Sequence, residues 1–166
     1  MTRPSWDDIW IEFAKTISRR SSDSNFKVGC CIVTQDNTQV LAIGYNGDHK
    51  GGSNKRESIE PGCSGFIHAE INALIKLDYN NPKQKTMYIT LSPCKHCAKA
   101  IINGGIDKVV YLDIYRDTSG LDLLNSFGIK TIKYNGDVNV LRSDAVIRND
   151  GSHKECIKSS SAVNRI

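Results

Sequence analysis

The sequence has no long hydrophobic run. A helix that spans a membrane needs roughly 18 or more apolar residues in succession, and the 166 residues contain no such stretch. The opening residues MTRPSWDDIW also lack the apolar core of a secretory signal and include two aspartates. We therefore expect a cytoplasmic protein without a membrane partner.

The sequence also lacks a strong excess of charge of either sign. Its 22 Lys and Arg residues against 18 Asp and Glu residues leave a net charge of +4. This balance is compatible with an anionic small molecule or with nucleic acid, but it requires neither. A basic surface for nucleic acid therefore has only weak support, and we expect no nucleic-acid partner.

Internal repeats are absent, and a disulfide framework is not expected. Six cysteines without a secretory signal do not predict such a framework. Cys30 and Cys31 are adjacent in an apolar run, which predicts small core residues. The informative pair is Cys94 and Cys97, which are separated by two residues.

What the sequence does contain is the hydrophobic spacing of an ordinary globular domain, with 39% hydrophobic and 24% charged residues. Ser5, followed by apolar residues at three- and four-residue steps, predicts a helix with Ser5 as N-cap and Asp8 at its third position. Arg19 and Arg20 mark its end.

The remaining pattern predicts a mixed α/β fold. Two β-branched runs joined by the turn QDNT predict a hairpin over 27–34 and 39–45. After a loop at 46–65, the expected elements are a helix at about 68–78, a strand at 86–91, a helix from Ser92-Pro93, a strand at 108–112, a helix at 119–127 and a strand at 129–134. We therefore expect a three-layer α/β/α sandwich with a mixed five-stranded sheet over residues 1–136. Residues 137–166 are polar and predict a tail or extension.

Two short motifs stand at predicted helix starts. The segment FIHAEINALI, residues 66–75, places His68 and Glu70 at the head of an apolar helical run, where buried polar groups need partners. In SPCKHC, residues 92–97, Ser92 and Pro93 suit an N-cap and a first helical position, so Cys94 and Cys97 should share a helix face.

Two thiolates at a helix start and a histidine make three ligands of a zinc site with an open position. A redox CxxC pair, a purely structural zinc site and core packing are the alternatives. The combination of HAE with PCxxC is typical of zinc-dependent deaminases of cytosine or adenine. His96, which lies between the two cysteines, should face away from them.

With these motifs in place, residues 5–134 resemble the zinc-dependent cytidine and deoxycytidylate deaminase superfamily. The similarity to its deoxycytidylate (dCMP) branch lies in five segments: RPSW at 3–6, KVGCCIV at 27–33 with GYNG at 44–47, IHAEINALI at 67–75, YITLSPCKHCAKAIINGGIDKVVY at 88–111, and YRD at 115–117. The resemblance implies the cytidine deaminase type of fold, one catalytic Zn²⁺ per chain and a homo-oligomer, either a dimer or a hexamer. It also implies a role in pyrimidine nucleotide metabolism.

The resemblance implies that His68, Cys94 and Cys97 bind the metal and that Glu70 is catalytic. Zinc lowers the pKa of bound water to about 7, and a carboxylate beside it can carry protons as a general acid–base. Glu70 is two residues from His68, which suits that role. The expected reaction is hydrolysis of dCMP to dUMP and ammonia, which supplies the thymidylate route.

Substrate recognition is predicted less directly. The asparagine of the GYNG segment is used near the sugar in the family; its alternative is a turn residue. A nucleotide phosphate needs cations or backbone amides, and Lys27, Arg116, Arg20 and Arg3 are the candidate cations. The full set of expected substrate-binding residues is Asn46, Ala69, Lys27, Tyr115, Arg116 and Ser92. Mg²⁺ bound with a nucleotide effector is a further expectation, although the loop at 46–65 lacks the branch's full pattern of Cys, His and Pro.

Other activities stay open at this point. A zinc deaminase could instead act on a free cytidine or deoxycytidine nucleoside, or on a base in RNA or DNA, as a tRNA adenosine deaminase does. A nucleic-acid-binding protein built on a structural zinc is the non-enzyme alternative, and it has no need for the carboxylate of Glu70.

Overall fold

The computed structural model describes residues 3–136, and the predicted extension at 137–166 lies outside them. Five strands form one sheet in the order β2-β1-β3-β4-β5. The pairs β1–β2 and β1–β3 are antiparallel, whereas β3–β4 and β4–β5 are parallel. The strands are β1 (Gly29–Thr34), β2 (Val40–Tyr45), β3 (Lys85–Leu91), β4 (Lys108–Asp113) and β5 (Lys130–Lys133). The predicted mixed five-stranded sheet is confirmed.

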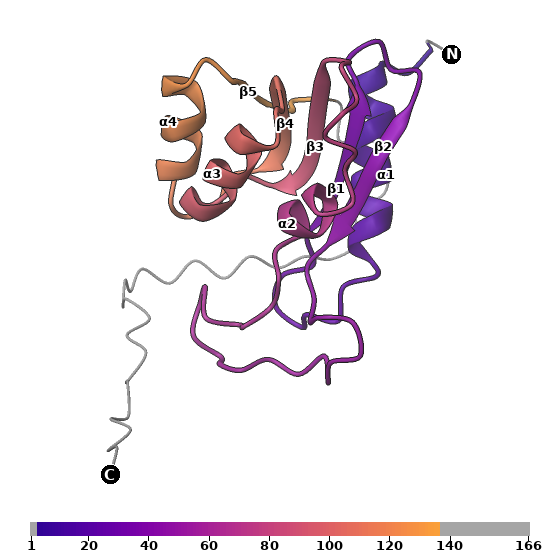
Figure 1. Cartoon of the computed structure of the whole chain (residues 1–166). Helices are drawn as coiled ribbons and strands as arrows, with labels where there is room; N and C mark the ends of the chain where they lie inside the picture. The colour runs from indigo at the N-terminus through magenta and orange to yellow at the C-terminus, as the bar shows by residue number, and fades with distance from the viewer. Residues whose placement is uncertain (1–2, 137–166) are drawn as a thin grey trace.

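Helices cover both faces of this sheet. Helix α1 packs on one face, and α2, α3 and α4 lie on the other (Figure 1). The helices are α1 (Trp6–Ser18), α2 (Ala69–Leu74), α3 (Lys95–Asn103) and α4 (Ser119–Ser126). The three-layer α/β/α architecture expected from the sequence is therefore confirmed.

Helix α1 begins as the sequence predicts. The Ser5 hydroxyl accepts a hydrogen bond from the Asp8 backbone N–H at 3.1 Å, and the Asp8 carboxylate accepts one from the Ser5 N–H at 2.7 Å. This reciprocal capping box satisfies two of the free amide groups at the helix start. Tyr88 of β3 donates to the Asp7 carboxylate at 2.6 Å, which fastens the same helix turn to the sheet.

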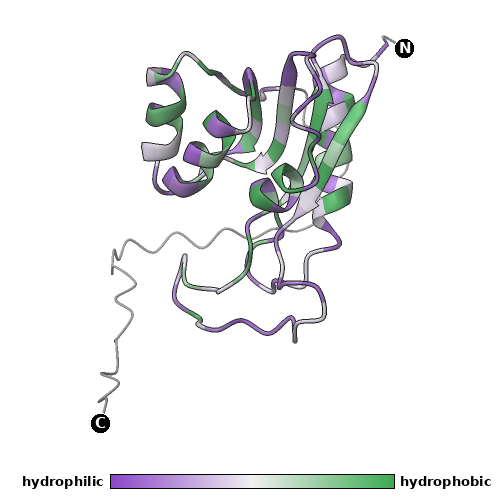
Figure 2. Cartoon of the chain, viewed as in Figure 1, coloured by the Kyte–Doolittle hydropathy of each residue, from purple (hydrophilic) through white to green (hydrophobic). Residues whose placement is uncertain are grey.

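The core lies in two layers, one on each face of the sheet. Every residue of β1 is buried, because α1 covers one of its faces and α2 covers the other. Cys30 faces the larger layer and Cys31 the smaller, so both are core residues as predicted. Figure 2 shows the hydrophobic residues concentrated in the strands, while the long loop after β2 is largely hydrophilic.

The parallel pair β3–β4 brings two strand ends together. Helix α3 connects these strands, so both point the same way and end at the same edge of the sheet. There the Ser92 backbone N–H donates to the Asp113 carbonyl at 2.9 Å, and the Ser92 hydroxyl accepts from the Tyr115 N–H at 2.8 Å. Clefts at this edge are where α/β folds commonly bind ligands.

Helix α2 is shorter than predicted, and this changes one core assignment. The helix ends at Leu74. After it, the Lys76 N–H donates to the Ala73 carbonyl and the Leu77 N–H to the Leu74 carbonyl, which is the three-residue spacing of a more tightly wound turn. This tighter winding turns Leu77 into the core and leaves the Ile75 side chain 67% exposed. The spacing of Ile67, Ile71, Leu74 and Ile75 in the sequence predicts one core face, and for Ile75 this prediction is wrong.

Two side chains from the α2 region reach the outer edge of the sheet. Asn72 donates to the Tyr45 carbonyl at 2.9 Å, and Lys76 donates to the Ile43 carbonyl at 3.1 Å. Both carbonyls belong to the edge strand β2.

Among the described residues, none of the helices has the length and apolar character that a membrane crossing requires.

Candidate functional site

Three side chains that can bind a metal converge at one point. His68 immediately precedes α2, while Cys94 and Cys97 stand at the start of α3. The His68 Nδ1 atom lies 3.3 Å from the Cys97 Sγ atom and 3.6 Å from the Cys94 Sγ atom. All three ligand atoms lie within 4.8 Å of one another. The structure thus brings together the three residues that the sequence predicts as metal ligands.

This geometry fits a zinc ion. With Zn–S near 2.3 Å and Zn–N near 2.0 Å, tetrahedral angles place a ligand nitrogen and sulfur about 3.5 Å apart. The two N–S distances in the structure, 3.3 and 3.6 Å, are close to this value. One imidazole and two thiols also form a ligand set that suits zinc, whereas magnesium and calcium bind to oxygen ligands. Three protein ligands leave the fourth position for water or substrate, as in catalytic zinc sites.

A glycine on β2 allows α2 to place His68. A Cβ atom at Gly44 would lie 2.1 Å from the Ala69 carbonyl oxygen and 2.6 Å from the Ala73 nitrogen, so only glycine permits this approach. Beyond the strand, Gly47 and Ile67 form an isolated antiparallel bridge with hydrogen bonds in both directions. These contacts fix the backbone on both sides of His68.

Helix α3 begins two residues later than the sequence predicts. Its N-cap is Cys94, and Pro93 and Ser92 precede the helix. The expectation that Ser92 caps the helix is wrong, because its hydroxyl instead accepts the Tyr115 N–H from the segment that follows β4. The predicted proximity of the two thiols still holds, since Cys94 and Cys97 occupy the N-cap and third helical positions.

The two thiols differ in their ease of ionisation. A hydrogen bond from the Cys97 thiol, assisted by His68, lowers the pKa of Cys94 to about 3. The pKa of Cys97 is raised, first by its hydrogen bond to Cys94 and then by burial. One thiolate therefore forms readily while the second does not, and a divalent cation at this point supplies the charge that allows both to ionise.

Glu70 is a buried carboxylate beside the three ligands. Its side chain is 4% exposed, and burial raises its pKa, while the neighbouring His68 opposes that shift. The Cys97 thiol is within hydrogen-bonding reach of the carboxylate. A carboxylate with a raised pKa can both accept and return a proton near neutral pH, which a general acid–base requires.

The other histidines in the described residues stay outside the cluster. His96 is exposed, as expected from its position between the two cysteines. His49 is exposed on the long loop and contacts Asp48 at 2.7 Å. No second group of three ligating side chains occurs within residues 3–136. The expectation of Mg²⁺ with a nucleotide effector has no support there.

Asn46 lies at the end of β2 and is buried. It stands two residues after Gly44, and side chains two apart along a strand point to the same face. Gly44 faces α2, so we expect the side chain of Asn46, one residue beyond the strand, to lie toward the same side of the sheet. Its amide oxygen accepts the Val28 N–H at 2.8 Å.

Tyr115 and Arg116 follow β4 and border the cysteine helix. Burial raises the pKa of Tyr115, and the charge of Cys94 adds to the shift, which places the phenol near the metal ligands. The guanidinium carbon of Arg116 stands 5.4 Å from the centre of the Tyr115 ring. Arg116 also donates to the Pro61 carbonyl at 2.8 Å, so the long loop reaches this point.

The remaining predicted substrate residues differ in their location. Ala69 is buried at the start of α2, and Lys27 is exposed just before Val28 at the same end of the sheet. Arg3 lies elsewhere, because the start of α1 reaches the β1–β2 turn through a 2.8 Å bond from Trp10 to Asn37. The structure therefore does not bring Arg3 to the cluster.

An ion pair that the sequence did not predict links two loops beside Asn46. Arg56 donates to the Asp23 carboxylate at 2.6 Å, and both side chains are largely buried. Asp23 lies in a polar segment that resembles an ordinary turn, and Arg56 lies within the mixed charges of the long loop. No periodic pattern or short motif connects residues so far apart in the chain.

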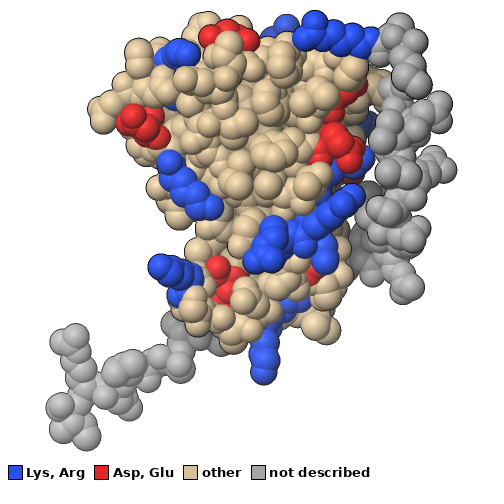
Figure 3. Space-filling view, turned by 90° about the vertical axis from the view of Figure 1, so that its right-hand side faces the viewer, with Lys and Arg blue, Asp and Glu red and all other residues tan. Residues whose placement is uncertain are grey.

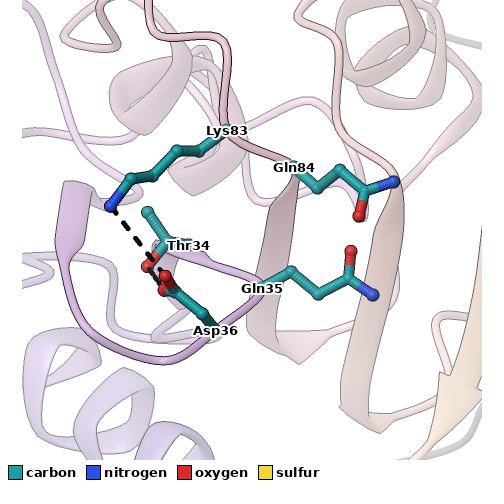
Figure 4. Close-up of a pocket in the computed structure, with 5 residues that line it drawn as sticks. All are labelled: Thr34, Gln35, Asp36, Lys83 and Gln84. Carbon is teal, nitrogen blue, oxygen red and sulfur yellow. Dashed lines mark hydrogen bonds and ion pairs between the residues drawn. The ribbon is translucent and has the colours of Figure 1, made fainter.

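A hollow in the surface lies far from the cluster. It has a volume of about 190 Å³ and is lined by Thr34, Gln35, Asp36, Lys83 and Gln84 (Figure 4). These residues surround the end of β1 and the start of β3, whereas the cysteines follow the end of β3. The hollow is therefore at the opposite edge of the sheet and contributes nothing to the cluster.

The charges on the face in Figure 3 are mixed. Lys and Arg stand among Asp and Glu around a broad area without charges, although basic residues are more frequent in the lower part. On this face the described residues form no continuous basic surface of the kind that contacts a nucleic-acid backbone.

Comparison with known proteins agrees with this geometry. Residues 4–113 match the family model described as the cytidine and deoxycytidylate deaminase zinc-binding region. Human deoxycytidylate deaminase is 32% identical over 142 residues, covering 78% of this chain and 79% of that protein. The deoxycytidylate deaminase of Mycobacterium phage D29 is 32% identical over 126 residues, covering 67% of this chain and 97% of that protein. The crystal structure of dCMP deaminase from cyanophage S-TIM5 in complex with dCMP and dUMP matches with a TM-score of 0.70 and 31% identity, covering 81% of this chain and all of that chain.

Proposed function

The chain belongs to the cytidine and deoxycytidylate deaminase family, and from this premise we propose that it hydrolyses dCMP to dUMP and ammonia. The observation that carries the proposal is the buried Glu70 beside a His68, Cys94 and Cys97 cluster with zinc-like spacing. Relatives named deoxycytidylate deaminase, and a neighbour whose structure holds dCMP and dUMP, support the substrate.

In the proposed reaction, His68, Cys94 and Cys97 hold the metal and Glu70 carries protons. Zinc, when bound, supplies a water of lowered pKa, about 7. Glu70 takes one proton from the water whose oxygen adds to C4 and delivers that proton to the cytosine ring nitrogen N3. It then takes the proton of the new C4 hydroxyl and gives it to the amino group, so that the C4–N bond breaks, ammonia leaves and the C4 carbonyl of dUMP remains. The raised pKa of Glu70 supports this role, since it allows the group to hold a proton between the two steps.

Substrate recognition is assigned to residues around the same edge of the sheet. We propose that Asn46 contacts the sugar, that Tyr115 packs on the base or sugar, and that Ala69 allows close approach of the base. Ser92 holds the backbone of Tyr115 and so shapes that side of the site.

For the phosphate, Lys27 and Arg116 are the proposed cations. Lys27 is exposed beside the segment that contacts Asn46, and Arg116 stacks over Tyr115. Arg20 lies at the same end of the molecule, after the last turn of α1.

A substrate panel tests this function. Purified, zinc-loaded protein is incubated with dCMP, deoxycytidine, dCTP and a tRNA anticodon stem, and ammonia release is followed. We expect turnover of dCMP with much slower turnover of the others, because only dCMP offers both the free sugar hydroxyl and a single phosphate. Turnover of deoxycytidine without dCMP would overturn the phosphate assignment, and turnover of the RNA alone would overturn the substrate class.

The other expectations from the family stay proposals. Residues 1–136 form the proposed deaminase domain, and the family match at 4–113 supports most of it. A homo-oligomer and a cytoplasmic location are proposed on the same resemblance. The nucleoside, nucleic-acid and structural-zinc alternatives are not favoured by the relatives found.

A further inference from the structure

Asp23 is a buried carboxylate outside the metal cluster that the proposed reaction does not use. Its side chain is 3% exposed. One carboxylate oxygen accepts hydrogen bonds from the Asn25 N–H at 2.8 Å, the Phe26 N–H at 3.3 Å and the Arg56 guanidinium at 2.6 Å. The other accepts the Asn46 amide at 3.3 Å. A buried charge with this many partners holds its surroundings in one arrangement.

These contacts determine how Asn46 is oriented. A backbone N–H can only donate a hydrogen bond, so the Asn46 atom 2.8 Å from the Val28 nitrogen must be the amide oxygen. A backbone carbonyl can only accept one, so the Asn46 atom 2.7 Å from the Phe26 carbonyl oxygen must be the amide nitrogen. The second hydrogen of that nitrogen goes to Asp23. Both donors of the amide are then used, and a single lone pair of its oxygen remains.

We propose that Asp23 and Arg56 are positioning residues that make Asn46 an obligatory acceptor toward a sugar hydroxyl. This inference rests on the proposed function, in which Asn46 contacts the sugar of dCMP. In dCMP the 5′-oxygen is esterified and the 2′-position has no hydroxyl, so the 3′-hydroxyl is the one free donor of the sugar.

Arg56 has two parts in this arrangement. Its guanidinium forms an ion pair with Asp23 at 2.6 Å, which offsets the cost of burying the carboxylate. Its Nε atom donates to the Ser58 carbonyl at 3.2 Å, so the same side chain fastens the long loop against the segment before β1. Loss of either partner leaves the Asn46 amide held only by the Val28 N–H and the Phe26 carbonyl, so its oxygen is fixed less firmly toward the sugar hydroxyl.

The test compares dCMP with 2′,3′-dideoxycytidine monophosphate, which lacks the sugar hydroxyl. The wild-type protein should prefer dCMP by about 10-fold or more in kcat/KM, as expected for one hydrogen bond to a buried polar group. In Asp23→Asn this preference should fall about 10-fold, because an amide places a donor opposite the donor of Asn46. Turnover of the dideoxy analogue should change little.

Two further variants make the result specific. Arg56→Lys keeps the charge but loses the second donor of the planar group, so it should show a smaller fall in preference even where Asp23→Asn folds poorly. Asp48→Asn is the matched control, because Asp48 accepts backbone N–H groups in the same loop without contacting Asn46. Its preference for dCMP should equal that of the wild type.

The outcomes separate this inference from the proposed function. If folded, zinc-loaded Asp23→Asn and Arg56→Lys both keep the wild-type preference for dCMP, Asp23 and Arg56 are structural only and the inference is wrong. If the wild-type protein does not turn over dCMP at all, the proposed function fails, and the inference fails with it.

Discussion

At the scale of single residues, Glu70 combines two properties that seldom occur together. It is an ionisable group in the core layer, and it lies beside a cluster of metal-ligating atoms without being one of the three. A carboxylate that served only to stabilise the fold would be expected to have a charged or amide partner. The neighbours of Glu70 are instead His68, Cys94 and Cys97, the three members of the metal-ligating cluster.

Replacing Glu70 with glutamine tests this role. Glu70→Gln keeps the shape and the hydrogen-bonding capacity of the side chain but cannot carry a proton, so dCMP turnover should fall by about 10²–10⁴-fold. Metal analysis should still find about one zinc per chain, as expected for a residue outside the ligand set. The exposed His96→Gln is the control and should match the wild type. Loss of zinc from Glu70→Gln would instead make Glu70 a ligand.

At the scale of elements, the site depends on backbones that approach one another closely at glycine. Gly44 lets α2 rest on β2, and Gly120 lets α4 rest on the segment that carries Cys94. A Cβ atom at Gly120 would lie 2.1 Å from the Pro93 carbonyl oxygen and 2.8 Å from the Cys94 carbonyl carbon. Helix α4 thus packs against the backbone of Pro93 and Cys94, although it supplies no ligand to the proposed metal.

Gly120→Ala should therefore reverse the usual effect of this substitution. In an ordinary helix position, alanine in place of glycine stabilises the protein by about 1 kcal/mol. Here the added methyl group displaces the Pro93–Cys94 backbone, so we expect a loss of roughly 1–3 kcal/mol in the free energy of unfolding. Urea titration measures this loss, and competition with a chelator should show weaker zinc retention.

The exposed Asp122→Ala on the same helix is the comparison variant for that experiment. Its unfolding free energy should change by about 0.5 kcal/mol or less, and its zinc retention should not change. A Gly120→Ala protein that is more stable than the wild type and retains zinc equally well would show that α4 does not position Cys94.

At the scale of the whole molecule, the proposed metal joins parts of the chain that are distant in sequence. His68 and Cys94 are 26 residues apart, and β3 lies between them. Within the described residues, the core layers on both faces of the sheet include none of the three metal ligands, although Cys97 is buried. The domain should therefore fold without zinc but be less stable.

Removal of the metal measures this contribution. At free zinc about 1,000-fold above its Kd, binding stabilises the folded state by about 4 kcal/mol, which corresponds to roughly 10 °C in Tm for a domain of this size. Calorimetry before and after chelation should show that shift, with the far-UV circular dichroism spectrum retained. Cys94→Ser should melt near the chelated wild type and respond little to either treatment. An unfolded chelated protein would contradict the independence of the core from the metal.

The sequence predicts the metal ligands because each is set by its immediate neighbours. His68 and Glu70 share one helix start, and Cys94 and Cys97 share another, so short-range spacing is enough to group them. The prediction that Ser92 caps α3 is wrong, because its hydroxyl accepts the N–H of Tyr115, which follows β4, and short-range spacing does not show this contact across 23 positions.

Other features depend on distant contacts and could not be predicted. Ile75 has the spacing of a core residue, but the helix stops at Leu74 and turns it outward. Asp23 and Arg56 lie in two different loops and form their ion pair across 33 positions of the chain that include β1 and β2. Neither loop has a periodic pattern, so the pairing comes entirely from the fold.

The hydrogen bonds at the outer edge of β2 bear on how copies of this chain can associate. An unpaired strand edge is a template on which another chain can add a strand. Here the carbonyls of Ile43 and Tyr45 already accept bonds from Lys76 and Asn72. Adding a strand would first have to break both bonds. Assemblies of this protein should therefore form between side-chain surfaces and not by continuing the sheet past β2, which also protects this edge against aggregation.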